Sequence, residues 1–169
     1  MPNLRMLALL QLALLLMGSA RGQDLPCPDD LAAASVLARL NALREQPRSC
    51  GAVPMPAAPT LRWKALLAAS ADEHARELAQ RDTLSHQGLK TRSLRERLHR
   101  AGYRMRLSGE NLAAGPASLE EALALWLASP GHCENLMLPE FRDAGLACAA
   151  APGRHERFWV LHLGRGAAE

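Results

Sequence analysis

The stretch WLASPGHCENLM, residues 126–137, decides how the rest of this chain is interpreted. Two earlier stretches, SGENLAAG at residues 108–115 and LSHQG at residues 84–88, have the same character. All three are polar or turn-rich and lie beside the end of a predicted helix. Connecting segments of this kind carry functional side chains more often than core positions do. We therefore expect the three stretches to meet at one surface cleft.

Each stretch contributes one candidate functional side chain: His86, Glu110 and His132. His86 lies in a Ser-His-Gln-Gly turn where no packing requires an imidazole, and His132 follows a Pro-Gly pair and opens a short helix. Two imidazoles and a carboxylate form a ligand set that suits zinc. Glu110 is also the candidate catalytic residue, although a turn carboxylate can simply accept backbone N–H bonds. The spacing thus predicts a metal-capable site.

The other four histidines have structural explanations. His74 lies on the apolar stripe of the second predicted helix, which favours a packed role. His162 alternates with apolar residues in a predicted strand and is expected in or at the rim of the sheet. His99 and His155 lie among Arg and Glu residues, which predicts exposed side chains. None of the four is expected to be a ligand.

The N-terminus has the layout of a secretory signal peptide. Arg5 precedes an apolar run at residues 6–17, and small residues follow, so cleavage is expected after Ala20 or Gly22. A membrane-spanning helix needs about 20 apolar residues, so an uncleaved anchor is the less favoured alternative. We predict that residues 1–22 are removed and that the protein is secreted or periplasmic, not an integral membrane protein.

Removing residues 1–22 deletes two arginines and no acid, so the formal charge falls from +3 to +1. The remaining chain, residues 23–169, has the length of one ordinary domain. It contains no basic block interleaved with aromatic residues, so nucleic acid is not an expected partner.

Four cysteines in an exported chain favour disulfide bonds. Cys27, Cys50, Cys133 and Cys148 allow three connectivities. A helix predicted over residues 29–46 would be about 25 Å long, so a bond between the cysteines just beyond its two ends would be strained. Rejecting that pair also rejects its complement, Cys133 with Cys148, and two connectivities remain from the residues alone.

Helices outnumber strands in the sequence pattern, which ends in a hairpin. After the first helix comes an extended, proline-rich connection. The second helix is capped by Thr60 and ends at Arg81, and capping boxes start the third at Ser93 and the fourth at Ser118. Two late strands are predicted at residues 144–150 and 157–164, with a turn between them. In the second strand, successive apolar side chains face opposite sides. This order predicts an α+β domain.

Signals for specific enzyme classes are few. The sequence has no HExxH, GxSxG, SxxK or phosphate-binding glycine loop. Cys133 is adjacent to His132, but export favours a disulfide over a thiol nucleophile. The three tryptophans lie on patterned elements and are expected to fill the core.

The SPGHC and GENLA segments, at this order and distance, resemble the CAP superfamily (SCP-like extracellular domain), which includes cysteine-rich secretory, antigen 5 and pathogenesis-related 1 proteins. The bacterial branch is the most similar, and the resemblance covers residues 41–164. It implies an α-β-α sandwich, rich in helices, with a C-terminal antiparallel hairpin. It also implies a disulfide between Cys50 and Cys133, which leaves Cys27 to pair with Cys148.

The resemblance further implies a cleft lined by two histidines and acidic residues, matched here by His86, Glu110 and His132. Animal and plant relatives carry a second glutamate at the position of Ser129, so the fourth zinc ligand here would be water or absent. Ser129 and Asn111 complete the expected cleft, although Asn111 more often fixes a loop.

Two functions remain open at the sequence level. The first is an extracellular binding module with a metal-capable cleft and a lipid, peptide or protein ligand from the surroundings or cell envelope. The alternative is a zinc-dependent hydrolase that acts on peptide or cell-envelope substrates, since zinc can lower the pKa of bound water to about 7. Members of the family share no single reaction, so the resemblance does not choose between them.

Overall fold

The computed structural model describes residues 26–167, so the predicted signal peptide lies outside the described residues. Within 26–167 no helix is long and apolar enough to cross a bilayer. The elements follow in the order α2 (Ala33–Arg44), β1 (Arg48–Cys50), β2 (Val53–Met55), β3 (Arg62–Trp63), α3 (Ala65–Arg81), α4 (Leu94–Arg100), β4 (Met105–Ala114), α5 (Leu119–Ala128), α6 (Pro130–Met137), β5 (Asp143–Ala150) and β6 (Arg157–Gly166).

A four-stranded sheet in the order β3-β5-β6-β4 forms the middle layer. β3 is parallel to β5, while β6 is antiparallel to both β5 and β4. The short strands β1 and β2 form a separate hairpin. β4 is therefore an edge strand, and its outer side is available to the segments that carry the candidate site.

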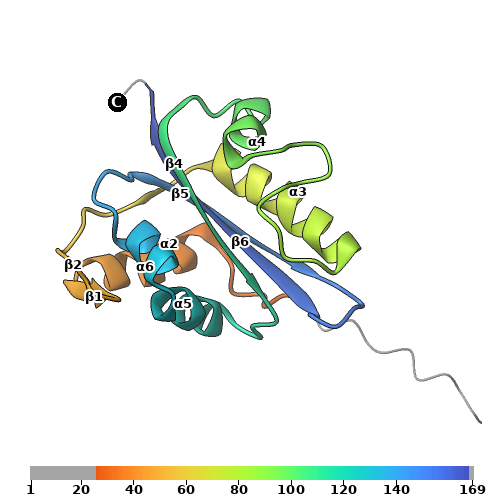
Figure 1. The fold of residues 1–169 in the computed structure, drawn as a ribbon, viewed down its shortest axis with the longest axis horizontal. Helices are drawn as coiled ribbons and strands as arrows, with labels where there is room; N and C mark the ends of the chain where they lie inside the picture. The colour runs from red at the N-terminus through yellow and green to blue at the C-terminus, as the bar shows by residue number, and fades with distance from the viewer. Residues whose placement is uncertain (1–25, 168–169) are drawn as a thin grey trace, which may run out of the picture.

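Helices cover both faces of this sheet, with α3 and α4 on one side and α2, α5 and α6 on the other (Figure 1). Strand β6 shows why, because its apolar side chains alternate between the two cores. Phe158 and Val160 pack with the alanines of α3, whereas Trp159 and Leu161 pack with Trp126 and its neighbours in α5. The α+β class and the α-β-α arrangement predicted above are both confirmed.

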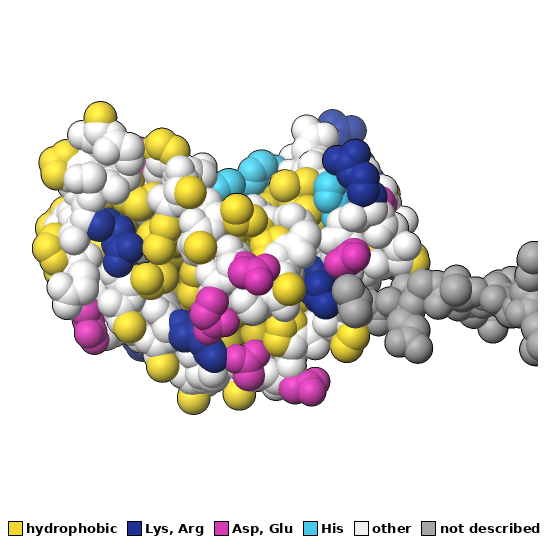
Figure 2. Space-filling model, turned by 90° about the horizontal axis from the view of Figure 1, so that it is seen from below, with side chains coloured by type: hydrophobic (Ala, Val, Ile, Leu, Met, Phe, Trp, Pro, Cys, Tyr) yellow, Lys and Arg dark blue, Asp and Glu magenta, His cyan; other side chains and the backbone are white. Residues whose placement is uncertain are grey.

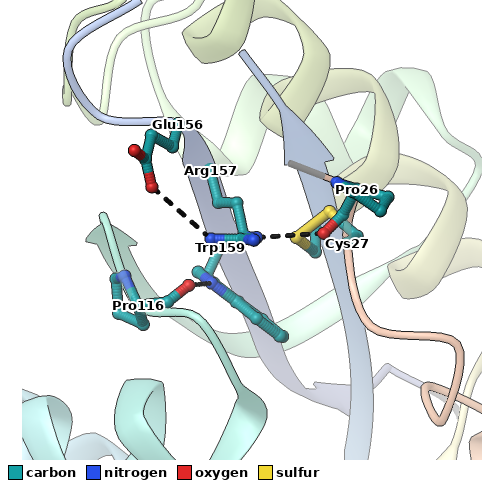
Figure 3. The surroundings of a disulfide bond; sticks show 7 residues. Pro26, Cys27, Pro116, Glu156, Arg157 and Trp159 are labelled. Carbon is teal, nitrogen blue, oxygen red and sulfur yellow. Dashed lines mark hydrogen bonds and ion pairs between the residues drawn. A yellow bond between two sulfur atoms is a disulfide. The ribbon is translucent and has the colours of Figure 1, made fainter. Parts of the chain in front are cut away.

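Both predicted disulfides are present. Cys50 and Cys133 join the β1–β2 hairpin to α6, and Cys27 and Cys148 join the start of the described chain to β5. Figure 3 shows that the second bond lies next to Arg157, whose Nε donates to the carbonyl of Pro26 at 3.0 Å. The segment before α2 is thus fastened to the sheet covalently and by hydrogen bonding.

Helix starts were predicted well where a side chain caps the helix. The hydroxyls of Ser93 and Ser118 each accept the backbone N–H three residues later at 3.2 Å, and α4 and α5 begin one residue after them. The Thr60 cap was wrong, because β3 intervenes and α3 begins only at Ala65. The first helix is shorter than predicted and has no side-chain cap.

Strand β4 is the largest element that the sequence pattern missed. Its SGENLAA segment is rich in small and polar residues, which are depleted in strands and are typical of turns. Nevertheless, it pairs with β6 over its whole length, from Met105 opposite Gly166 to Ala114 opposite Phe158. The apolar partner strand and the two helical layers override the local preference, and Glu110 lies in a strand instead of a turn.

Candidate functional site

Strand β4 gives the candidate site its base. Side chains alternate across the sheet, so Glu110 and Leu112 face α3 while Asn111 and Ala113 face α5 and α6. His86 comes from the loop after α3 and His132 from α6. The two histidines thus reach β4 from opposite layers. Figure 2 shows a face of the molecule that is hollowed at its upper edge, with histidine side chains, in cyan, beside the hollow.

Glu110 is buried and accepts three charge-assisted or imidazole hydrogen bonds. Its Oε1 accepts from Nδ1 of His86 at 2.7 Å. Its Oε2 accepts from Nη2 of Arg97 at 2.6 Å and from Nε2 of His162 at 2.8 Å. The carboxylate side chain is only 3% exposed, so both of its oxygens are committed to protein partners. Of these partners, the sequence had suggested only His86.

The electrostatics of this cluster keep Glu110 ionised. Burial alone would raise the pKa of its carboxyl, but the hydrogen bonds from His162 and His86 and the charge of Arg97 lower that pKa well below its usual range. The same bond to Glu110 raises the pKa of His86, against an opposing effect of burial. Glu110 is therefore a fixed negative charge that orients the His86 ring and leaves the Nε2 side of the ring for other contacts.

Two further histidines lie beneath the site and are neutral there. His162 and His74 have fully buried side chains, and burial lowers the pKa of each despite the nearby Glu110 carboxylate. His74 Nε2 lies 3.0 Å from the carbonyl oxygen of Ser85, one residue before His86. The prediction that His74 and His162 are packed structural residues agrees with this burial, but both also contribute to the surroundings of Glu110.

Asn111 holds α6 against β4. Its Nδ2 donates to the carbonyl of His132 at 2.9 Å, and its Oδ1 accepts from Nδ2 of Asn135 at 3.0 Å. Asn111 is completely buried, so it positions the backbone of His132 and does not line the cleft surface. Ser129 is half-buried at the start of α6, where its carbonyl accepts the N–H of Cys133.

His132 is half-buried, and its imidazole interacts electrostatically with His86. Burial lowers the pKa of His132, and the positive charge of His86 lowers it further. The lowered pKa favours the neutral form of the His132 imidazole.

The donor set fits a metal less closely than the sequence predicted. Within residues 26–167, no group of three or more His, Cys, Asp or Glu side chains is arranged to hold a metal ion. The physical reason is that Glu110 is bound to Arg97, His162 and His86, and ligation would break one of these bonds. His86 and His132 remain as a pair of imidazoles. Glu110 holds the imidazole of His86 through Nδ1.

Arg97 is the functional residue that sequence analysis overlooked. It is 2% exposed, and besides Glu110 it donates to Oγ1 of Thr91 at 3.1 Å and to the carbonyl of His86 at 3.3 Å. It therefore fastens the loop that carries His86. Its position with Leu94 and Leu98 on the inner side of α4 was a usable signal, since residues three and four apart share one helix face.

We expect the protein to lose stability as the pH falls below about 6.5. His74 and His162 have lowered pKa values when folded, so the unfolded state binds protons first and their contribution, present above pH 6.5, is lost as the pH falls. The lowered pKa of the Glu110 carboxyl extends this loss of stability to pH values below 4.5, which is the ordinary pKa of a glutamate. His86 has the opposite sign, because its raised pKa stabilises the fold below pH 6.5 and loses that effect as the pH rises.

Urea unfolding at pH 7 and at pH 5 checks this balance. Three histidines with lowered pKa values, His74, His132 and His162, oppose one with a raised pKa, so the free energy of unfolding should be smaller at pH 5. A His99→Ala variant is the control, since it removes one imidazole that is exposed on α4 and lies outside the buried cluster. An unfolding free energy that stays equal or rises at pH 5 would contradict the neutral state of His74 and His162.

Comparison with known proteins supports the fold. The model of the CAP family, described as the cysteine-rich secretory protein family, matches residues 37–163. A search of curated proteins found no significant match. An extracellular SCP-domain protein from Bacillus anthracis is 26% identical with a TM-score of 0.64, and the match covers 79% of this chain and 40% of that one. This chain thus corresponds to less than half of that protein.

Two more distant structures share the fold. An outer surface protein from Borrelia burgdorferi is 21% identical with a TM-score of 0.62, and the match covers 79% of this chain and 89% of that one. A crystal structure of NaASP2 with Zn²⁺ is 17% identical with a TM-score of 0.52, and the match covers 82% of this chain and 83% of that one.

Proposed function

Because this chain belongs to the CAP, or cysteine-rich secretory protein, family, we propose that it is an exported binding module whose cleft takes its ligand at the imidazoles of His86 and His132. The observation that carries this proposal is the orientation of His86. Its Nδ1 is held by the buried Glu110 at 2.7 Å, while its side chain is 63% exposed. A carboxylate behind an exposed imidazole fixes the tautomer that leaves Nε2 free to bind.

Zinc is the metal that best suits this pair. Imidazole nitrogen is a preferred zinc donor, and a site with two protein ligands leaves positions open for water and for a ligand oxygen. The zinc present in the NaASP2 structure supports the proposal by likeness of fold. Bound zinc would supply positive charge and open coordination positions, and Glu110, anchored by Arg97, would keep His86 in place.

A binding role is better supported than zinc-dependent hydrolysis. A general base must accept a proton near neutral pH, but the pKa of Glu110 is held far below that range and both of its oxygens are committed. Cys133 is bonded to Cys50 and offers no thiol. Export of the protein is consistent with its two disulfides and with its family, and the ligand is expected among lipids, peptides or proteins outside the cytoplasm.

Zinc calorimetry on alanine variants tests the site. We expect the His86→Ala, His132→Ala double variant to lose most zinc binding, and His99→Ala to bind as the wild type does, because His99 is exposed on α4. Affinity should weaken as the pH falls, since both imidazoles must be neutral. The fold should survive, because neither side chain belongs to the buried core. Equal zinc affinity in the wild type and the double variant would refute the site.

A further inference from the structure

Three arginines converge on one pocket at an end of the central sheet, away from the histidine site. The pocket has a volume of about 320 Å³ and is lined by Thr60, Arg62, Arg142 and Arg165. Arg62 begins β3, Arg142 immediately precedes β5, and Arg165 lies near the end of β6. The backbone N–H of Arg62 donates to the carbonyl of Arg142, and that of Arg142 to Gly164. Three adjoining strand ends therefore each bring one guanidinium to the same place.

The charge of this cluster is only partly balanced by the protein. Arg62 pairs with Asp143 at 3.0 Å, and the second oxygen of Asp143 accepts the hydroxyl of Tyr103 at 2.8 Å. Arg142 donates from Nη1 to the carbonyls of Pro139 and Phe141, which carry no charge. No acidic residue among residues 26–167 lines the pocket. Within this described range, the charges of Arg142 and Arg165 therefore remain uncompensated on neighbouring strands, an arrangement that destabilises a sheet unless an anion is bound.

Arg165 gives the second indication of a missing partner. Its side chain is half-buried, and its Nε is a buried donor without a hydrogen-bond acceptor among residues 26–167. An unsatisfied buried donor costs free energy comparable to a lost hydrogen bond. The presence of such a donor at Arg165 therefore needs an explanation. An anionic ligand in the pocket would provide the acceptor.

We propose that this pocket is a binding site for the phosphate group of a phosphorylated ligand. A phosphate dianion matches the two uncompensated charges, and its oxygens can accept paired N–H bonds from planar guanidinium groups. The hydroxyl of Thr60 supplies a further donor at the rim. A soluble phosphomonoester and a phospholipid headgroup present the same chemistry, so the source is decided by experiment.

The test follows the Arg165 Nε–H signal by NMR while inorganic phosphate is added to the full chain at physiological ionic strength. We expect this signal to shift, and Arg165→Gln to weaken phosphate binding about tenfold through loss of one charge-assisted contact. Thr60→Val should weaken binding by a smaller factor without changing the charge. Arg95→Gln is the matched control, because Arg95 is exposed and lines a different pocket.

Two further titrations identify the source. Glycerol phosphate represents a soluble phosphomonoester, and phosphatidylcholine vesicles containing phosphatidic acid represent a lipid headgroup. Binding that is sensitive to Arg165→Gln in either titration supports the site and names its source. Absence of a shift with phosphate, or equal weakening by Arg165→Gln and Arg95→Gln, would overturn it. The outcome is independent of zinc binding at His86 and His132.

Discussion

Replacement of Arg97 by methionine is expected to lower the free energy of unfolding by about 3–5 kcal/mol, because it leaves the Glu110 carboxylate buried without its cationic partner. Arg97 and Glu110 are 2% and 3% exposed at the side chain, and their closest atoms are 2.6 Å apart. Methionine retains much of the side-chain length, so the loss reports mainly on charge and hydrogen bonding. Urea unfolding at pH 7 measures the effect.

Two comparison variants make the result specific. Arg95→Met removes the same charge from the exposed side of α4 and should change the unfolding free energy by less than about 0.5 kcal/mol. In the double variant Arg97→Met, Glu110→Gln, both charges are absent, and the destabilisation should be smaller than the sum of the single effects. Strict additivity would mean that Arg97 stabilises the fold by packing alone.

The Arg97→Met variant also tests whether Arg97 positions His86 for zinc binding. Arg97 also donates to the carbonyl of His86, so its loss should loosen the loop that carries this histidine. We therefore expect weaker zinc binding in Arg97→Met even under conditions where the protein stays folded. His99→Ala, on the same helix, should not have this effect.

Only part of the candidate site could be predicted from the sequence. His86 and Glu110 are identifiable because each stands in a polar segment, and they do contact each other. His162 was not connected to Glu110, because that contact depends on the register between β4 and β6, and β4 itself resembled a turn. Arg97 was hidden within a segment rich in exposed arginines, where one inward-facing guanidinium cannot be recognised by composition.

The fold was predicted more completely, because its main signals are local. Serine caps set the starts of α4 and α5, and strict alternation in β6 distributed apolar residues between two cores. The short strands β1, β2 and β3 have two or three residues each, too few for a periodic pattern. Their formation depends on partners distant in the chain, which single-sequence patterns do not encode.

A close approach between α3 and β5 supplies the second large effect. A Cβ atom at Gly145 would lie 2.1 Å from the backbone nitrogen of Ala68 and 2.4 Å from the carbonyl carbon of Leu67. These are backbone atoms of α3, so no side-chain rotation can relieve the contact. Gly145 is opposite His162 in the β5–β6 pairing, so this approach also sets the distance between α3 and the histidines beneath Glu110.

We expect Gly145→Ala to lower the free energy of unfolding by more than about 3 kcal/mol, because overpacking commonly costs about 1–3 kcal/mol even when side chains can adjust. Gly131→Ala is the matched control. Apart from the chain neighbours and the backbone of α6 itself, no atom lies within 4 Å of its added Cβ. Alanine also favours a helix more than glycine does, so this variant should be neutral or slightly stabilised. Urea unfolding of both variants at pH 7 measures the contrast. A Gly145→Ala protein as stable as Gly131→Ala would mean that α3 can move away from the sheet at little cost, and the rigid support inferred for His74 and Glu110 would then be wrong.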